Sequence, residues 1–308
     1  MHAHTHVPET GRVLRWSLVA TLLFVVFEFF AGIQAHSLAL LSDAGHNLTD
    51  AAALLLAAVA HRLQSRPANE RKTFGYHRTG VLAALLNAQT LLLLSGWIFY
   101  ESYQRLRQPE AVQESIMLIV AGLGLVLNGG IMWGLRIASR DDINVRSAFV
   151  HMLGDLLGSI AIIFGALGIR YTGWRQIDPL LSIVIGALII FTAWGIVKES
   201  LDILLEGMPR GLQLQSVAAV LRGVEGVIDV HDLHIWSLGS STHALSCHVL
   251  IDDVPPSSSN AILERVNHVL ADRFQIRHTT VQFEHVCCPL SENGCVIPAP
   301  GQPHPHEH

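Results

Sequence analysis

The chain has 308 residues, of which half are hydrophobic and 15% are charged, and its formal net charge at pH 7 is −5. Its mean hydropathy is positive, at +0.40. A soluble domain of this length does not need so apolar a composition, which therefore indicates a membrane protein. The small net charge says little because it is spread over tails and loops, but its negative sign argues against a nucleic-acid partner.

Six apolar stretches are long enough to cross a bilayer as helices, at 13–33, 37–61, 80–100, 116–137, 144–169 and 179–197. An even number of spans leaves both ends of the chain on one side of the membrane. Basic residues gather on that side, namely Arg12, Arg15, Arg62, Arg66, Arg71, Lys72, Arg78, Arg136, Arg140 and Arg146. The positive-inside rule therefore predicts cytoplasmic termini, and we expect a multi-pass protein of the cell inner (plasma) membrane.

The pattern His-x-x-x-Asp occurs twice within these stretches, as His46 with Asp50 and as His151 with Asp155. Residues four apart lie on one helix face, roughly 6 Å apart along the axis. The second and fifth spans run in opposite directions, so packing them side by side would bring His46 near Asp155 and Asp50 near His151. Two imidazoles and two carboxylates suit a tetrahedral Zn²⁺.

Other interpretations of these residues stay open. A buried histidine can be a hydrogen-bonded core residue, and a His and Asp set can carry protons without a metal. Asp43 and Asn47 flank the first pair, where either could orient a ligand or line the approach to the site.

Four motifs in order resemble the cation diffusion facilitator family, closest to its zinc-transporting branch. They are residues 42–50 (SDAGHNLTD), 73–78 (TFGYHR), 151–155 (HMLGD) and 231–236 (HDLHIW). The resemblance implies a homodimer that exchanges cytoplasmic zinc for protons, with the transport site at His46, Asp50, His151 and Asp155. One departure is Gly80, which stands where the family usually has an acidic residue and so removes a possible partner of Arg78.

The composition changes after residue 206, so we expect a six-span domain over 12–206 and a second domain over 207–288. Helical patterns at 212–222 and 262–274 and strand patterns at 227–238, 242–251 and 278–286 predict the order αββαβ. This order indicates a cytoplasmic α+β domain with a ferredoxin-like arrangement, which would bind metal and dimerise. The segments 1–11 and 289–308 have no periodic apolar face and are expected to be disordered.

By resemblance, the zinc ligands of the second domain are His234, His248 and Glu284, and His77 and His278 could bridge the loop before the third span to that domain. Strand histidines can equally be solvent-facing sheet residues. Beyond the last strand, Cys287 or Cys288 with Cys295 could complete a further site, or all three could be reduced thiols on a tail. Cys247 alternates to the opposite strand face from His248 and is expected in the core.

These patterns together predict a proton-coupled antiporter that exports zinc from the cytoplasm, with cadmium and cobalt as further candidates. The alternative is a metal-gated channel or a metal sensor in the membrane, for which conduction would be insensitive to pH. A hydrolase needs an open metal position, and four protein ligands leave none, so no enzyme is expected.

Overall fold

The computed structural model describes residues 7–138, 143–239 and 242–286, and the side chains at 19–53, 55–133, 153–239 and 242–286. Its elements fall into two compact units. The first contains residues 1–59 and 83–198, and the second contains 60–82 and 199–308. The loop between the second and third predicted spans therefore belongs to the unit that also contains the C-terminal domain.

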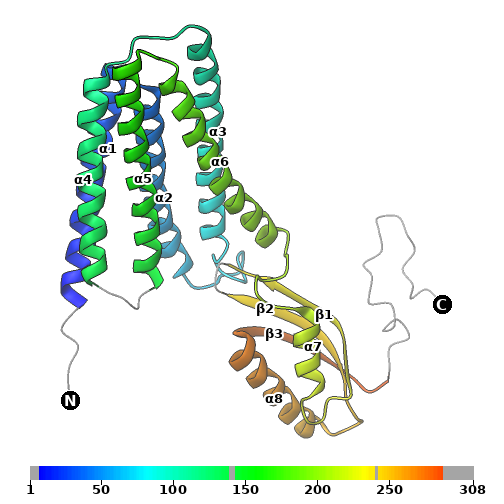
Figure 1. Cartoon of the computed structure of the whole chain (residues 1–308). Helices are drawn as coiled ribbons and strands as arrows, with labels where there is room; N and C mark the ends of the chain where they lie inside the picture. Colours follow the sequence, from blue (N-terminus) through cyan, green and yellow to red (C-terminus); the bar gives the residue numbers. More distant parts are fainter. Residues whose placement is uncertain (1–6, 139–142, 240–241, 287–308) are drawn as a thin grey trace. The chain divides into compact units, whose positions relative to one another are not determined.

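Six long helices follow one another along the chain and alternate in direction (Figure 1). They are α1 (Val7–Ala35), α2 (Leu38–Gln64), α3 (Thr79–Arg107), α4 (Glu114–Ala138), α5 (Ile143–Thr172) and α6 (Ile177–Leu204). Each contains one of the six predicted spans, except that α2 begins one residue after the start of the span 37–61. The first helix begins at Val7, inside the segment 1–11 expected to be disordered, and Pro8 is compatible with its first turn.

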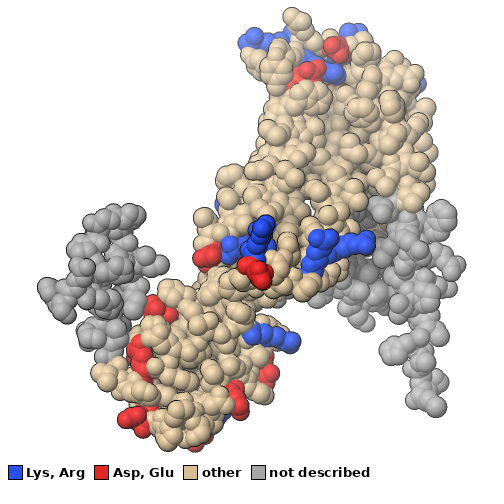
Figure 2. Space-filling view, turned by 180° about the vertical axis from the view of Figure 1, so that it is seen from behind, with Lys and Arg blue, Asp and Glu red and all other residues tan. Residues whose placement is uncertain are grey.

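Among the described residues, α3 and α6 and the segments Glu114–Trp133 and Leu153–Thr172 are long and apolar enough to cross a membrane. The described apolar part of α1, Val19–Ala35, is shorter. Helix α2 carries Asp43, His46, Asn47 and Asp50 within its apolar stretch, which lowers its hydropathy. On the face shown in Figure 2, the helical unit has a broad band without Lys, Arg, Asp or Glu, and charged residues gather beyond it. A band of this kind suits the apolar interior of a bilayer.

The C-terminal domain has the predicted element order αββαβ. It consists of α7 (Leu214–Arg222), β1 (Asp229–Ser237), β2 (His243–Leu250), α8 (Pro256–Phe274) and β3 (Ile276–Glu284). The sheet order is β1-β2-β3, with β1 antiparallel and β3 parallel to β2. Helix α8 begins six residues earlier than predicted, because Pro256 fits the first turn of a helix, where its missing N–H costs no hydrogen bond.

One face of this sheet forms the core of the domain with both helices. Val217 and Leu221 of α7, and Val266 and Leu270 of α8, are completely buried against it. Alternation along β2 places Leu245, Cys247 and Val249 on this face, and therefore Ser246 and His248 on the other. The sheet face away from the helices is thus the one that carries His248.

The thiol of Cys247 is expected to resist alkylation in the native protein. The residue is 2% exposed, and burial, reinforced by the charge of Asp232, raises the pKa of the thiol to about 12. Because the thiolate is the reactive form, the native thiol should stay unmodified by iodoacetamide at neutral pH and become modified in guanidinium. Peptide mass spectrometry of the two samples tests this; equal modification in both would contradict burial in the core.

Candidate metal centres

In the helical unit, α2 presents His46 and Asp50 on one face. The His46 Nε2 atom lies 3.7 Å from Asp50 Oδ2, and the two side chains are 25% and 26% exposed. The α-helical spacing of four residues produces this contact. The pair is therefore partly buried.

Helix α5 runs antiparallel to α2 (Figure 1). A Cβ atom added at Gly158 of α5 would lie 3.6 Å from Asp43 Oδ1 of α2, so these two residues lie at about the same level. Three residues further along α2 is His46, and three residues back along α5 is Asp155. Because all α-helices rise by the same distance per residue, these two positions lie at one level.

The same register places Asp50 at the level of His151, one helical turn further on. Asp155 is 7% exposed. The side chain of His151 lies outside the described residues, although its backbone belongs to α5. Further buried polar residues lie near this level, namely Asp43 and Asn47 of α2 and Glu28 of α1.

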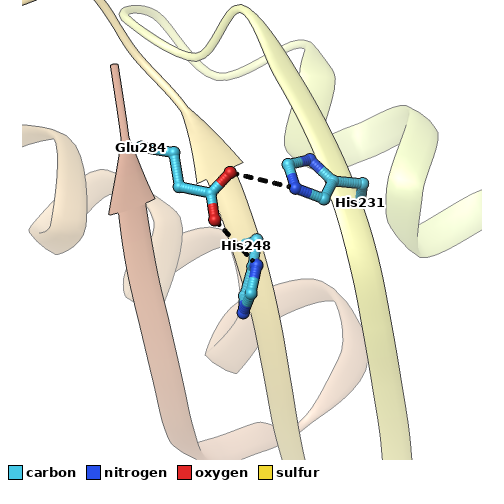
Figure 3. Close-up of side chains that lie close together, drawn as sticks. All are labelled: His231, His248 and Glu284. Atoms are coloured by element: carbon cyan, nitrogen blue, oxygen red, sulfur yellow. Dashed lines mark ion pairs between the residues drawn. The ribbon is translucent and has the colours of Figure 1, made fainter. Parts of the chain in front are cut away.

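In the C-terminal domain, three side chains from three strands converge on the sheet face away from the helices (Figure 3). His231 Nε2 lies 3.1 Å from Glu284 Oε2, and His248 Nδ1 lies 2.9 Å from Glu284 Oε1. The candidate ligand atoms all lie within 4.8 Å of one another. We call these residues the sheet cluster.

The sheet cluster contains His231, and not His234, which the resemblance names as a ligand. Residue His231 is paired with His248, but His234 is paired with Ser246, so β1 carries one extra residue between these pairs. This bulge includes Asp232, whose φ is +48°. A regular hairpin would instead have placed Asp232 opposite His248, and no sequence pattern reveals the extra residue.

His234 lies on the far side of this bulge from Glu284. Its Nε2 atom is 3.0 Å from Asp232 Oδ1, and the other oxygen of Asp232 is 3.7 Å from His248 Nε2. The ring of His234 is 54% exposed, whereas that of His231 is only 7% exposed. His234 is therefore linked to the cluster through Asp232.

The chemistry of the sheet cluster fits a metal ion. Within the described part of the chain, His231 Nε2, His248 Nδ1 and Glu284 Oε2 are buried and have no partner in hydrogen-bond geometry, despite the short distances between them. Buried polar atoms without hydrogen bonds are costly, and an ion between them would remove this cost. Two imidazoles and one carboxylate are a ligand set that zinc uses, with a fourth position open.

The loop 65–78 lies against the C-terminal domain within the second unit. The rings of Phe74 and His278 are 5.2 Å apart, and a Cβ atom added at Gly239 would lie 2.9 Å from the His77 carbonyl oxygen. The backbone of the loop at His77 therefore lies close to the backbone of the C-terminal domain at Gly239. His77 and His234 both line a cavity of about 690 Å³ between this loop and β1.

Arg78 has an acidic partner after all. Its Nη2 atom donates a hydrogen bond of 3.1 Å to Glu206 Oε1. An acid distant in sequence therefore pairs with Arg78 in place of the local acidic residue for which Gly80 stands. The predicted ligands Cys287, Cys288 and Cys295 lie outside the described residues.

The family models of known proteins match almost the whole chain. The cation efflux transmembrane domain matches residues 14–205, and the cytoplasmic domain of cation efflux proteins matches residues 209–286. The chain belongs to the cation diffusion facilitator family. Family membership confirms the predicted fold class, and the chain is a metal cation efflux transporter rather than an enzyme.

Family members from several bacteria are similar over nearly their full length. The zinc transporter ZitB of Pectobacterium atrosepticum is 42% identical over 289 residues, which cover 93% of this chain and 89% of the relative. The metal cation efflux system protein CzcD of Cupriavidus metallidurans is 39% identical over 287 residues (93% and 90%). A Bacillus subtilis protein named cadmium, cobalt and zinc/H(+)-K(+) antiporter is 38% identical over 285 residues (91% and 91%).

Proposed function

We propose that this family member is an antiporter that exports Zn²⁺ from the cytoplasm in exchange for protons. The transport site consists of His46, Asp50, His151 and Asp155. The observation that supports this site best is the close approach of Asp43 to Gly158, because two antiparallel helices aligned on this contact carry the two His-x-x-x-Asp pairs at neighbouring levels. The names of the relatives, which include zinc transporters and a metal/proton antiporter, support the metal and the counter-ion.

Transport of zinc would be coupled to transport of protons because both bind to the same histidine nitrogen and carboxylate oxygen atoms. Zinc binds to a neutral imidazole and an ionised carboxylate, so a proton must leave before the metal binds and can displace it afterwards. An inward proton gradient then favours metal release on the outer side. Cadmium and cobalt use similar ligands and are further candidate substrates.

The sheet cluster would hold a second, regulatory zinc ion, with His231, His248 and Glu284 as ligands. The C-terminal domain would also join two copies of the chain into a homodimer, as the resemblance of this domain implies. We place the protein in the inner (plasma) membrane with both termini in the cytoplasm, on the basis of the basic residues near the ends of the spans. His77, His278 and the three tail cysteines remain candidate ligands.

Zinc flux into proteoliposomes tests the proposed function. The purified full chain is reconstituted into vesicles that contain a fluorescent zinc indicator, with either an acidic lumen or no pH gradient. We expect zinc uptake to be several-fold faster with the acidic lumen and to lose this advantage when a protonophore is added. Vesicles without protein are the control for leakage. Equal uptake under both conditions would contradict proton coupling and favour a channel.

A further inference from the structure

The start of α2 is held by a residue of another helix. Helix α1 ends at Ala35 and α2 begins at Leu38, so only His36 and Ser37 connect them. Asp178, near the start of α6, accepts hydrogen bonds from Ser37 Oγ at 2.6 Å, Leu38 N at 2.8 Å and Ala39 N at 3.3 Å. Asp178, Ser37, Leu38 and Ala39 are all completely buried. We call this arrangement the α2 anchor.

The anchor satisfies backbone groups that a helix start leaves without partners. The first four N–H groups of a helix have no acceptor one turn earlier within the helix. Here, Leu38 and Ala39 donate to the carboxylate of Asp178, and Leu40 N donates to Ser37 Oγ at 3.2 Å. The acceptor of the first two donors lies 140 and 139 positions away, so the start of α2 depends on the position of α6.

A second contact fixes the same corner from α3. Arg105 Nη1 donates a 2.6 Å hydrogen bond to the carbonyl oxygen of His36. The guanidinium is held in turn by Glu101 at 3.0 Å and Glu110 at 3.7 Å, and its side chain is only 13% exposed. The corner between α1 and α2 is therefore bonded to both α3 and α6.

We propose that Asp178 is a positioning residue for metal transport, which sets the depth and the rotation of α2 and thereby the places of His46 and Asp50. This inference rests on the proposed function, since it assigns a role in positioning the proposed transport site. His46 lies eight residues after Leu38, or about 12 Å along the helix. Over so short a distance an α-helix is stiff, so a shift at its start reaches His46 with little loss.

Both carboxylate oxygens are needed for this role. Oδ1 accepts from Ser37 and Ala39, and Oδ2 accepts from Leu38. Asparagine has the same shape but offers one oxygen and one donor group, so one N–H of α2 would face another donor. In Asp178→Asn, α2 must shift or rotate to relieve this conflict.

The test measures zinc and cadmium transport by full-length variants reconstituted into proteoliposomes. Cadmium is larger than zinc, so the ratio of the two rates reports on ligand spacing, which a loss of folded protein alone would not change. For Asp178→Asn we expect the KM for zinc to rise roughly tenfold and the cadmium-to-zinc ratio to change at least threefold, because ligand displacements of about 1 Å have large effects. Ser182→Ala is the matched control, since Ser182 is completely buried on α6 and its hydroxyl donates to the carbonyl oxygen of Asp178 rather than to α2.

Gel filtration in detergent shows whether each variant is folded. If Asp178→Asn is not recovered, Ser37→Ala replaces it, because this variant keeps the bonds of Leu38 and Ala39; a smaller change of the KM in the same direction is expected. A folded variant with the native KM and the native metal ratio would overturn the inference while native transport still supports the proposed function. Absence of metal transport by the native chain would reject both.

Discussion

Replacing Asp155 with alanine is expected to lower the rate of zinc transport at least about 100-fold, the largest effect that we expect of a single substitution. Asp155 is 7% exposed and lies on α5 at about the level of His46 on α2. Removing its carboxylate takes away one of four proposed ligands and leaves the ion with a single neutralising charge. An uncompensated charge inside the membrane costs roughly 3 kcal/mol or more.

The proteoliposome assay with an acidic lumen measures this loss. Asp155→Asn keeps the shape of the side chain but not its charge, and it should lower the rate of zinc transport almost as much as Asp155→Ala. Asp50→Ala should also lower this rate strongly. Asp202→Ala is the control, because Asp202 is an exposed residue in the last turns of α6. Native transport by a folded Asp50 or Asp155 variant would show that the metal is bound elsewhere.

Replacing His231 with alanine is expected to weaken zinc binding by the C-terminal domain at least tenfold, whereas replacing His234 should have little effect. His231 supplies a buried nitrogen atom 3.1 Å from Glu284, while the exposed His234 pairs with Asp232. The two variants together distinguish the sheet cluster from the ligand set that the family resemblance suggested.

Zinc titration of the purified full chain measures this difference. The titrations use a parent chain that carries both Asp50→Ala and Asp155→Ala and therefore lacks the proposed transport site. The zinc binding that remains then comes from the C-terminal domain. In this background His231→Ala, His248→Ala and Glu284→Ala should each weaken the same binding event, and acidification should weaken it in the parent, because protons compete for the ligands. A larger loss with His234→Ala than with His231→Ala would contradict the proposed cluster.

The sequence predicted the helices and the element order well because these depend on local patterns. Apolar length identifies membrane helices, and alternation identifies strands, so the predicted spans and the αββαβ order agree with α1 to α6 and with the C-terminal domain. Other features depend on residues distant in sequence. The partner of Arg78 is Glu206, and the acceptor at the start of α2 is Asp178, and no local pattern indicates either.

The sequence by itself determined the fold class, the family and the two His-x-x-x-Asp pairs, because a helix of fixed period places residues four apart on one face. Only the tertiary structure decided which strand histidine meets Glu284. One extra residue in β1 shifts the pairing so that His231, and not Asp232, lies opposite His248. A β-strand has a period of two, so a single inserted residue changes which side chains share a face, and an amino-acid pattern does not show where that insertion lies.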